Sequence, residues 1–428
     1  MTQLKPDKSK EVRHLATIIA SGLLLVLIFS AVWLVKNLRK GIYNKMQGIY
    51  NKIYGDKVIW GVIISLALLS IPIVYVGTEQ LALLRGGNFF YFVIKHALIL
   101  GGAFFIAYQV SKLKHGYLSR ISIILMVITL PLLFYTMVAG HNVDDASRWI
   151  KIPVIGLSFQ TSDFAKLSLT IYLARVLSRK QGELKNFKEV LIHLFIPIIF
   201  TCALIIKSDF STAALIMGSC FIMLFFGGVK LSHFGIIFFV IICLFTLMVL
   251  LFPENLQRLQ TWSNRLTAFT SENASAGSGN YQTSLAQASI YDGGAVGLWF
   301  DILPGKYGQP PQAASDFIYA TILRNYGLFG GVFTIIMYLI LFFRSIKIAR
   351  KCNKLFSTLL VIGLSSGLVI QAFSNMAVAV GVFPVTGQPL PMVSMGGTSL
   401  WFTAISIGII LSVSRETSSN KPTHEETT

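Results

Sequence analysis

The feature that most constrains this chain is the recurrence of apolar stretches about twenty residues long. A helix of that length crosses the hydrocarbon core of a bilayer, which is about 30 Å thick. Only 13% of the 428 residues are charged, whereas a soluble domain carries about a quarter. The sequence therefore predicts an all-α, polytopic membrane protein. Its expected spans are 15–35, 57–76, 90–110, 121–139, 162–178, 189–206, 209–229, 232–252, 316–343, 355–381 and 396–414.

The distribution of positive charge predicts how these spans are oriented. The net charge of +18 would suit a nucleic-acid-binding protein. However, the lysines and arginines lie in short loops between apolar stretches, as expected for loops on the cytoplasmic side of a membrane. We therefore expect no nucleic-acid partner. The loops assigned to the cytoplasmic side are 36–57, 111–120, 179–188 and 344–354.

The opposite, external face is poor in lysine and arginine and holds most of the acids. Segment 253–315 is its only long loop, and loops longer than about 15 residues are commonly functional or disordered. Helical spacing over residues 259–269 predicts an amphipathic surface helix within it. Residues 1–55 form a predicted N-terminal extension with an additional helix and a basic linker, and residues 416–428 form a polar cytoplasmic tail.

The tripeptide Ser-Asp-Phe occurs three times, and each copy precedes an apolar stretch on the external face. Its aspartates are Asp163, Asp209 and Asp316. Aspartate is a preferred N-cap, worth about 1 kcal/mol, so simple capping is the expected role of Asp163 and Asp209. If all three helices run from outside to inside, their N-termini face the same side and favour an anionic ligand such as a diphosphate.

Lys166 is unusual because it lies one turn inside a predicted span, on nearly the same face as Asp163. An intramembrane lysine has to pair, line a cavity or reach the interface. The sequence leaves open an Asp163–Lys166 pair and a phosphate contact. Arg148 suits phosphate oxygens, and with Trp149 it also suits an interfacial anchor. No spacing of metal-ligand residues is evident, so no metal site is predicted.

Several segments, taken in order, resemble the SEDS family of shape, elongation, division and sporulation proteins. They are ASRWI at 146–150, SFQTSDFAKL at 158–167, KSDFSTA at 207–213, SDFIYA at 315–320 and PVTGQPLPMVSMGGTS at 384–399. The last segment is long and specific. The resemblance covers about residues 56–415 and implies a core of ten transmembrane helices, with the large external loop between core helices 7 and 8. The ending of the last segment favours the FtsW branch over RodA.

The resemblance implies a peptidoglycan glycosyltransferase of the bacterial cytoplasmic membrane. Such an enzyme polymerises lipid II, a disaccharide-pentapeptide on undecaprenyl diphosphate, with a class B penicillin-binding transpeptidase and other division proteins as partners. The matching element makes Asp316 the catalytic residue. The donor is α-linked and the product β-linked, so one inverting displacement suffices, and a carboxylate accepts the proton of the attacking hydroxyl.

The leaving diphosphate needs cations or oriented hydrogen-bond donors. No cofactor is expected, and a divalent cation between the acid and the diphosphate stays an open alternative. The candidate substrate-binding residues are Arg148, Gln160, Lys166, Gly396, Gly397, Thr398 and Ser399, with Asp163, Asp209 and Trp149 in supporting roles.

The chain departs from the family pattern around the expected site. Arg324 and Asn325 stand where the family has a pair of glutamates, and Ala314 replaces a histidine. Residues 297–302 also lack the expected lysine. These changes keep open a non-catalytic scaffold of the division or elongation machinery. A transporter that flips a lipid-linked precursor is a separate alternative, and the clustering of charges at helix ends on one face argues against it.

Overall fold

The structure is a computed structural model that describes residues 54–78, 89–139, 141–143, 146–151, 158–206, 208–237, 278–299, 310 and 312–419. The chain divides into two compact units, Met1–Ile53 and Tyr54–Thr428, and all described residues belong to the second. The predicted span 15–35, most of span 232–252 and the predicted surface helix at 259–269 therefore lie outside the described residues.

The second unit is a bundle of long apolar helices, as the sequence predicts. Within the described residues, seven helices are long and apolar enough to cross a membrane, and the ten-helix count stays a prediction. The helices are α2 (Lys57–Gly77), α4 (Phe89–Lys112), α5 (Gly116–Ala139), α6 (Thr161–Arg179), α7 (Phe187–Val190), α8 (Ile196–Ile206), α9 (Phe210–Phe226), α12 (Ser278–Gly293), α13 (Ile318–Ala349), α14 (Leu355–Ala379) and α15 (Thr398–Ser419).

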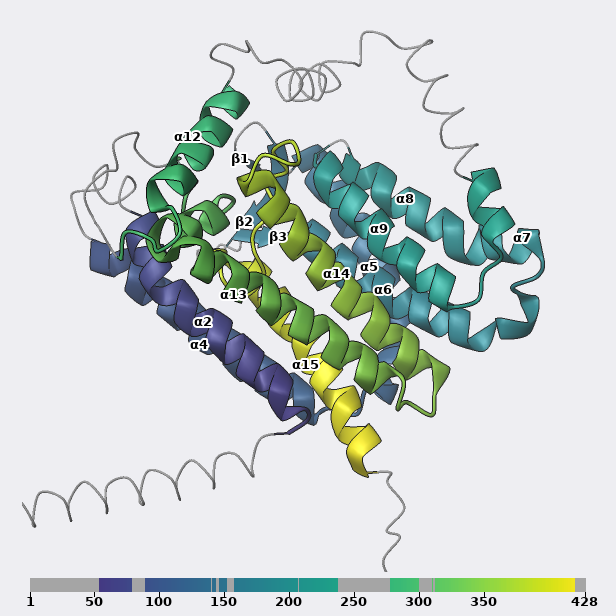
Figure 1. Ribbon diagram of the computed structural model, residues 1–428. Coiled ribbons are helices and arrows are strands. Elements are labelled where there is room, and N and C mark those ends of the chain that lie inside the picture. Colours follow the sequence, from purple (N-terminus) through teal and green to yellow (C-terminus); the bar gives the residue numbers. More distant parts are fainter. Residues whose placement is uncertain are drawn as a thin grey trace, which may run out of the picture. The chain divides into compact units, whose positions relative to one another are not determined.

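Helices α13 and α14 pack against each other and separate two groups of helices (Figure 1). On one side α2 packs on α13, and α4 packs on both α2 and α15. On the other side α6 and α9 pack on α14, with α5 against α6 and α8 against α9. A π-helical turn, Leu191–Phe195, joins α7 to α8, so that these three pieces form one span.

The helix ends next to the basic loops meet at one end of the bundle. Asp56 caps α2 by accepting from Val58 N at 2.9 Å, and its other oxygen accepts from Arg344 Nε at 2.7 Å. At the same end, Arg415 donates to the carbonyl of Lys112 at 2.8 Å. These contacts gather at one end three of the loops that charge alone assigned to the cytoplasmic side.

The structure adds elements that the sequence did not predict. Strands β1 (His141–Val143), β2 (Ala146–Lys151) and β3 (Ser158–Gln160) form an antiparallel sheet in the order β1-β2-β3. Helix α12 lies within the long external segment. Its serine, glycine, asparagine and glutamine content favoured a loop, but the helix packs on α13, so tertiary contacts outweigh local propensity there.

The span predicted at 316–343 is broken rather than continuous. Helix α13 begins at Ile318, and Gly327 interrupts it with φ 61° and ψ −159°, a conformation that is essentially restricted to glycine. Backbone freed at the break is bound by residues that follow α12: Leu298 N donates to Arg324 O at 3.0 Å and Trp299 N to Asn325 O at 2.9 Å. Such a break is stable only where protein groups replace the lost helical bonds.

Replacing Gly327 with alanine should destabilise the fold strongly. A Cβ at Gly327 would lie 2.3 Å from the carbonyl oxygen of Ala295, and the backbone conformation is strained for any L side chain. We expect a loss of roughly 3 kcal/mol or more, measured as a lower unfolding temperature in detergent. Gly61→Ala is the matched control, since nothing lies within 4 Å of a Cβ there. Equal unfolding temperatures for the two variants would contradict the assigned break.

Candidate active site

At the end of the bundle opposite the basic loops, the start of α6 contacts the start of α15, and the starts of α9 and α13 are contacted by Gln388 and Asn375. Gln160 N, just before α6, donates to the Thr398 hydroxyl at the start of α15 at 3.4 Å. Gln388 Nε2 donates to Asp209, before α9, at 3.3 Å. Asn375 Nδ2 donates to the carbonyl of Asp316, before α13, at 2.7 Å. The structure thus brings together the segments that the sequence singled out.

The three Ser-Asp-Phe copies take three different positions relative to their helices. Asp209 is the N-cap of α9 and accepts from Thr212 N at 3.0 Å and from its hydroxyl at 2.6 Å, so the predicted capping role is confirmed. For Asp163 that role is wrong, because Gln160 is the N-cap and Asp163 lies in the first turn. Asp316 does not start a helix either: the N-cap is Phe317, and Asp316 lies in the preceding turn.

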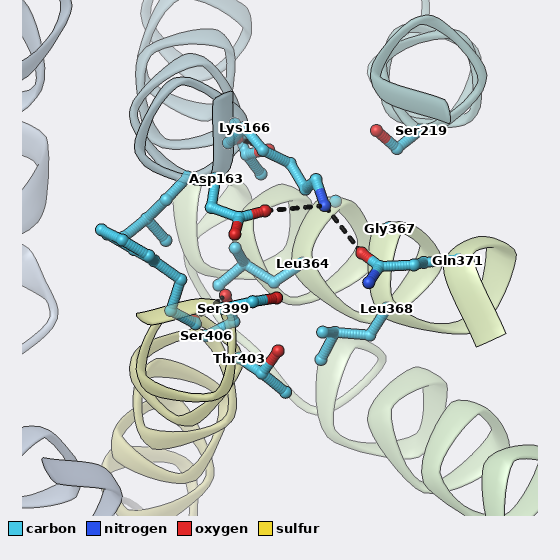
Figure 2. Close-up of a pocket in the computed structure, with 14 residues that line it drawn as sticks. Asp163, Lys166, Ser219, Leu364, Gly367, Leu368, Gln371, Ser399, Thr403 and Ser406 are labelled. Atoms are coloured by element: carbon cyan, nitrogen blue, oxygen red, sulfur yellow. Dashed lines mark hydrogen bonds and ion pairs between the residues drawn. The ribbon is translucent and has the colours of Figure 1, made fainter. Parts of the chain in front are cut away.

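Asp163 and Lys166 form the ion pair that was one of the two predicted roles for this lysine. The ammonium lies 3.6 Å from Asp163 Oδ1 and donates to Gln371 Oε1 on α14 at 2.7 Å. Figure 2 shows the ammonium between these two side chains. Asp163 is buried, while Lys166 keeps one-fifth of its side chain exposed (20%).

The pair lies on the wall of a polar cavity of about 30 Å³ between α6, α9, α14 and α15 (Figure 2). A space of this size in a polar setting is large enough for water. Asp316 is not among the described residues that line it. Polar side chains and glycines make up much of the wall: Asp163, Lys166, Thr170, Ser219, Gly363, Gly367, Gln371, Ser399, Thr403 and Ser406.

A buried, non-helical loop, residues 388–395, lies between the helix starts. Buried backbone carbonyls need hydrogen-bond partners, and four consecutive carbonyls of this loop have them. Ser394 N donates to Leu390 O at 2.9 Å within the loop. The other three partners are side chains of α13 and α14: Asn375 to Gln388 O (2.8 Å), Gln371 to Pro389 O (2.8 Å) and Tyr338 to Pro391 O.

The same loop holds the turn that carries Asp316. Met395 N donates to Ala314 O at 2.8 Å, and the Ser394 hydroxyl donates to Ser315 O at 2.6 Å. The carbonyl of Asp316 accepts from Asn375, as described above. The backbone around the predicted catalytic residue is thus fixed by groups far away in the sequence.

The remaining predicted residues lie on two neighbouring elements. Arg148 and Trp149 lie on β2, where Trp149 pairs with Gln160 of β3. Gly396 and Gly397 lead into α15. On that helix, Thr398 and Ser399 occupy the first two positions, with Ser399 on the cavity wall. The predicted diphosphate-binding residues therefore converge on the start of α6 and the start of α15.

Sequence reasoning missed the amide side chains that join these parts, namely Gln371, Asn375 and Gln388. Gln371 and Asn375 are 4% and 1% exposed. They stand four residues apart on α14, hence on one face of it. Buried amides inside a predicted span require partners, and their spacing is the signal that could have identified them. Among the described residues, no three His, Cys, Asp or Glu side chains gather as metal ligands.

Comparison with known proteins agrees with this arrangement. Probable peptidoglycan glycosyltransferase FtsW of Bacillus subtilis is 32% identical over 365 residues, covering 82% of this chain and 88% of that protein. Stage V sporulation protein E of the same organism is 30% identical over 367 residues, covering 83% and 96%.

Two solved structures share the fold. One is a chain of a peptidoglycan synthase complex that coordinates polymerization and crosslinking. It is 24% identical, with a TM-score of 0.67 over 86% of this chain and 99% of that chain. The other is the rod shape determining protein RodA of Thermus thermophilus, which is 21% identical, with a TM-score of 0.58 over 86% and 98%.

Residues 56–419 match the family described as Cell cycle protein, the family of FtsW, RodA and SpoVE. This match spans most of the chain and every element of the site. The chain therefore belongs to the FtsW/RodA/SpoVE family of multi-pass membrane proteins.

Proposed function

We propose that this chain is a peptidoglycan glycosyltransferase that polymerises lipid II at the external face of the bacterial cytoplasmic membrane, as part of septal wall synthesis. Membership of the family and the names of its relatives support the reaction class. One observation carries the assignment to this site: a single buried loop, residues 388–395, holds the turn of Asp316 and also contacts Gln371, the partner of Lys166. The catalytic unit is the segment 56–415.

In the proposed reaction, the acceptor sugar hydroxyl attacks the anomeric carbon of the donor from the face opposite the diphosphate. Asp316 takes the hydroxyl proton as the new glycosidic bond forms. The bond between the anomeric carbon and the diphosphate oxygen breaks, and undecaprenyl diphosphate leaves with the bonding electrons. The anomeric configuration is inverted in this single displacement.

The leaving diphosphate gains negative charge, and cationic and hydrogen-bond-donating groups stabilise it. Lys166 supplies an ammonium on a side chain that is one-fifth exposed. The start of α15 supplies backbone N–H groups and the hydroxyls of Thr398 and Ser399. Arg148 and Gln160 complete the proposed binding set, Asp163 orients Lys166, and Asp209 and Trp149 hold the surrounding segments.

A class B penicillin-binding transpeptidase is the proposed partner, because glycan strands need crosslinking and one fold relative is a chain of a complex that coordinates both activities. Other division proteins are further proposed partners. No cofactor is required by the proposed step.

Replacing Asp316 with asparagine should abolish polymerisation. Asparagine keeps the shape of the side chain but cannot accept the proton, and loss of a general base costs roughly 100- to 10,000-fold in rate. The measurement is glycan-strand synthesis from lipid II by purified protein with its transpeptidase. Glu183→Gln, which changes an acid with a 54% exposed side chain beyond the far end of α6, is the control. Full activity of Asp316→Asn would refute the assignment of the base, and lipid II flipping without polymerisation would favour the transporter alternative.

Variants of the ion pair separate a structural role of Lys166 from a role in binding. Lys166→Ala leaves Asp163 buried without its cation, so we expect a loss of about 2 kcal/mol in stability together with a loss of activity. The double variant Asp163→Leu/Lys166→Met should recover stability, because an apolar pair can replace a buried ion pair. Its activity should stay at least tenfold below wild type in the same polymerisation assay. A double variant with wild-type activity would show that the pair is structural only.

A further inference from the structure

The position of Asp316 does not depend on helical hydrogen bonds of its own. Asp316 lies in the turn before α13, two positions ahead of the first helical residue, Ile318. Instead, four consecutive carbonyls, those of residues 313–316, accept hydrogen bonds from groups outside that turn. The donors are the hydroxyl of Thr321 (3.0 Å), Met395 N (2.8 Å), the hydroxyl of Ser394 (2.6 Å) and the amide of Asn375 (2.7 Å).

Asn375 is the member of this set that acts directly on Asp316. Its side chain is 1% exposed, and its amide nitrogen donates both to Asp316 O at 2.7 Å and to Gln388 O at 2.8 Å. An amide nitrogen has two hydrogens, so both are in use. Asn375 thereby fixes the backbone of Asp316 against the loop 388–395.

Gln371 makes the equivalent connection one turn earlier on the same face of α14. It donates to Pro389 O at 2.8 Å and accepts from the Lys166 ammonium at 2.7 Å. Two amides one helical turn apart thus bind two consecutive carbonyls, and each also contacts one proposed functional residue. The contacts form an unbroken path from Lys166, through Gln371, the loop and Asn375, to Asp316.

We propose that Asn375 is a positioning residue for Asp316, and that Gln371 and Asn375 together fix the separation between the base and the Lys166 ammonium. This inference rests on the proposed function. An inverting displacement needs the base on the acceptor side and the cation on the diphosphate side at a fixed spacing. A displacement of about 1 Å in such a geometry can lower a rate about 100-fold.

The test compares Asn375→Ala with wild type in the polymerisation assay with the transpeptidase partner present. We expect kcat to fall about 10- to 100-fold and KM for lipid II to change less than about threefold, because Asn375 orients the base without binding substrate. Asn375→Asp keeps the side-chain shape but replaces the donor with an oxygen facing two carbonyls, so its kcat should fall at least as far. Asn375→Ser, which keeps one short donor, should lie between wild type and Asn375→Ala.

Ser357→Ala is the matched control for the loss of a buried hydrogen bond. Ser357 lies on the same helix at the opposite end of the bundle, is 3% exposed and contacts His115 Nε2 at 2.7 Å. We expect kcat of this variant to stay within about twofold of wild type. A kcat loss for Ser357→Ala equal to that for Asn375→Ala would mean that Asn375 acts only through stability and would overturn the proposal.

Coupling between the two amides is tested with the double variant Gln371→Ala/Asn375→Ala. If both amides fix one spacing, the fold-loss in kcat of the double variant should be smaller than the product of the fold-losses of the two single variants. Simple multiplication of the losses would overturn the coupling.

Wild-type protein that makes no glycan strands would refute the proposed function and this inference with it. Active wild type together with a fully active Asn375→Asp variant would refute the inference alone.

Discussion

The need to pair buried backbone polar groups is the constraint on which this structure depends. A helix pairs them internally, but a non-helical segment between membrane helices needs partners from elsewhere. Among the described residues, the turn before α13, the break at Gly327 and the loop 388–395 are such segments, and the turn and the loop contact each other directly. Each is held by donors from another segment or by buried side chains of α13 and α14. The irregular backbone is therefore as firmly fixed as the helices around it.

This constraint also explains how three aspartates far apart in the sequence come to be connected to one loop. Asp209 is bound by Gln388 of the loop, and Asp316 is held by Asn375. Asp163 joins through Lys166 and its contact with Gln371. The same loop therefore receives a connection from each aspartate. Asp209 is a helix cap, Asp163 is half of an ion pair and Asp316 lies in a turn. The local tripeptide is the same in all three, but the contacts that connect each aspartate to the loop differ.

The sequence predicted the parts of this protein that follow from local composition. Apolar length predicted the spans, and loop charge predicted which helix ends lie together, as the contacts of Asp56 with Arg344 confirm. The motifs predicted segments that the structure brings together. The break at Gly327 and the roles of Gln371 and Asn375 were missed, because each depends on a partner more than ten residues away. Hydropathy is averaged over a window of residues, so it does not reveal a break inside an apolar helix. The preference of aspartate for N-caps also does not distinguish Asp209, which is a cap, from Asp316, which is not.

Two of the residues that depart from the family pattern, Arg324 and Asn325, have buried side chains and contribute their backbone carbonyls to these contacts. Arg324 and Asn325 precede the break at Gly327 in α13, and their carbonyls accept from Leu298 N and Trp299 N. Every residue type offers the same carbonyl, so replacement of a glutamate pair leaves those two bonds available. The close approach instead requires glycine at 297 and 327, where a Cβ would lie 2.3 Å from a carbonyl oxygen in each case. Both glycines are present. The departures therefore place Arg324 and Asn325 where the family has acids, while the close packing of residues 297–299 on α13 is retained.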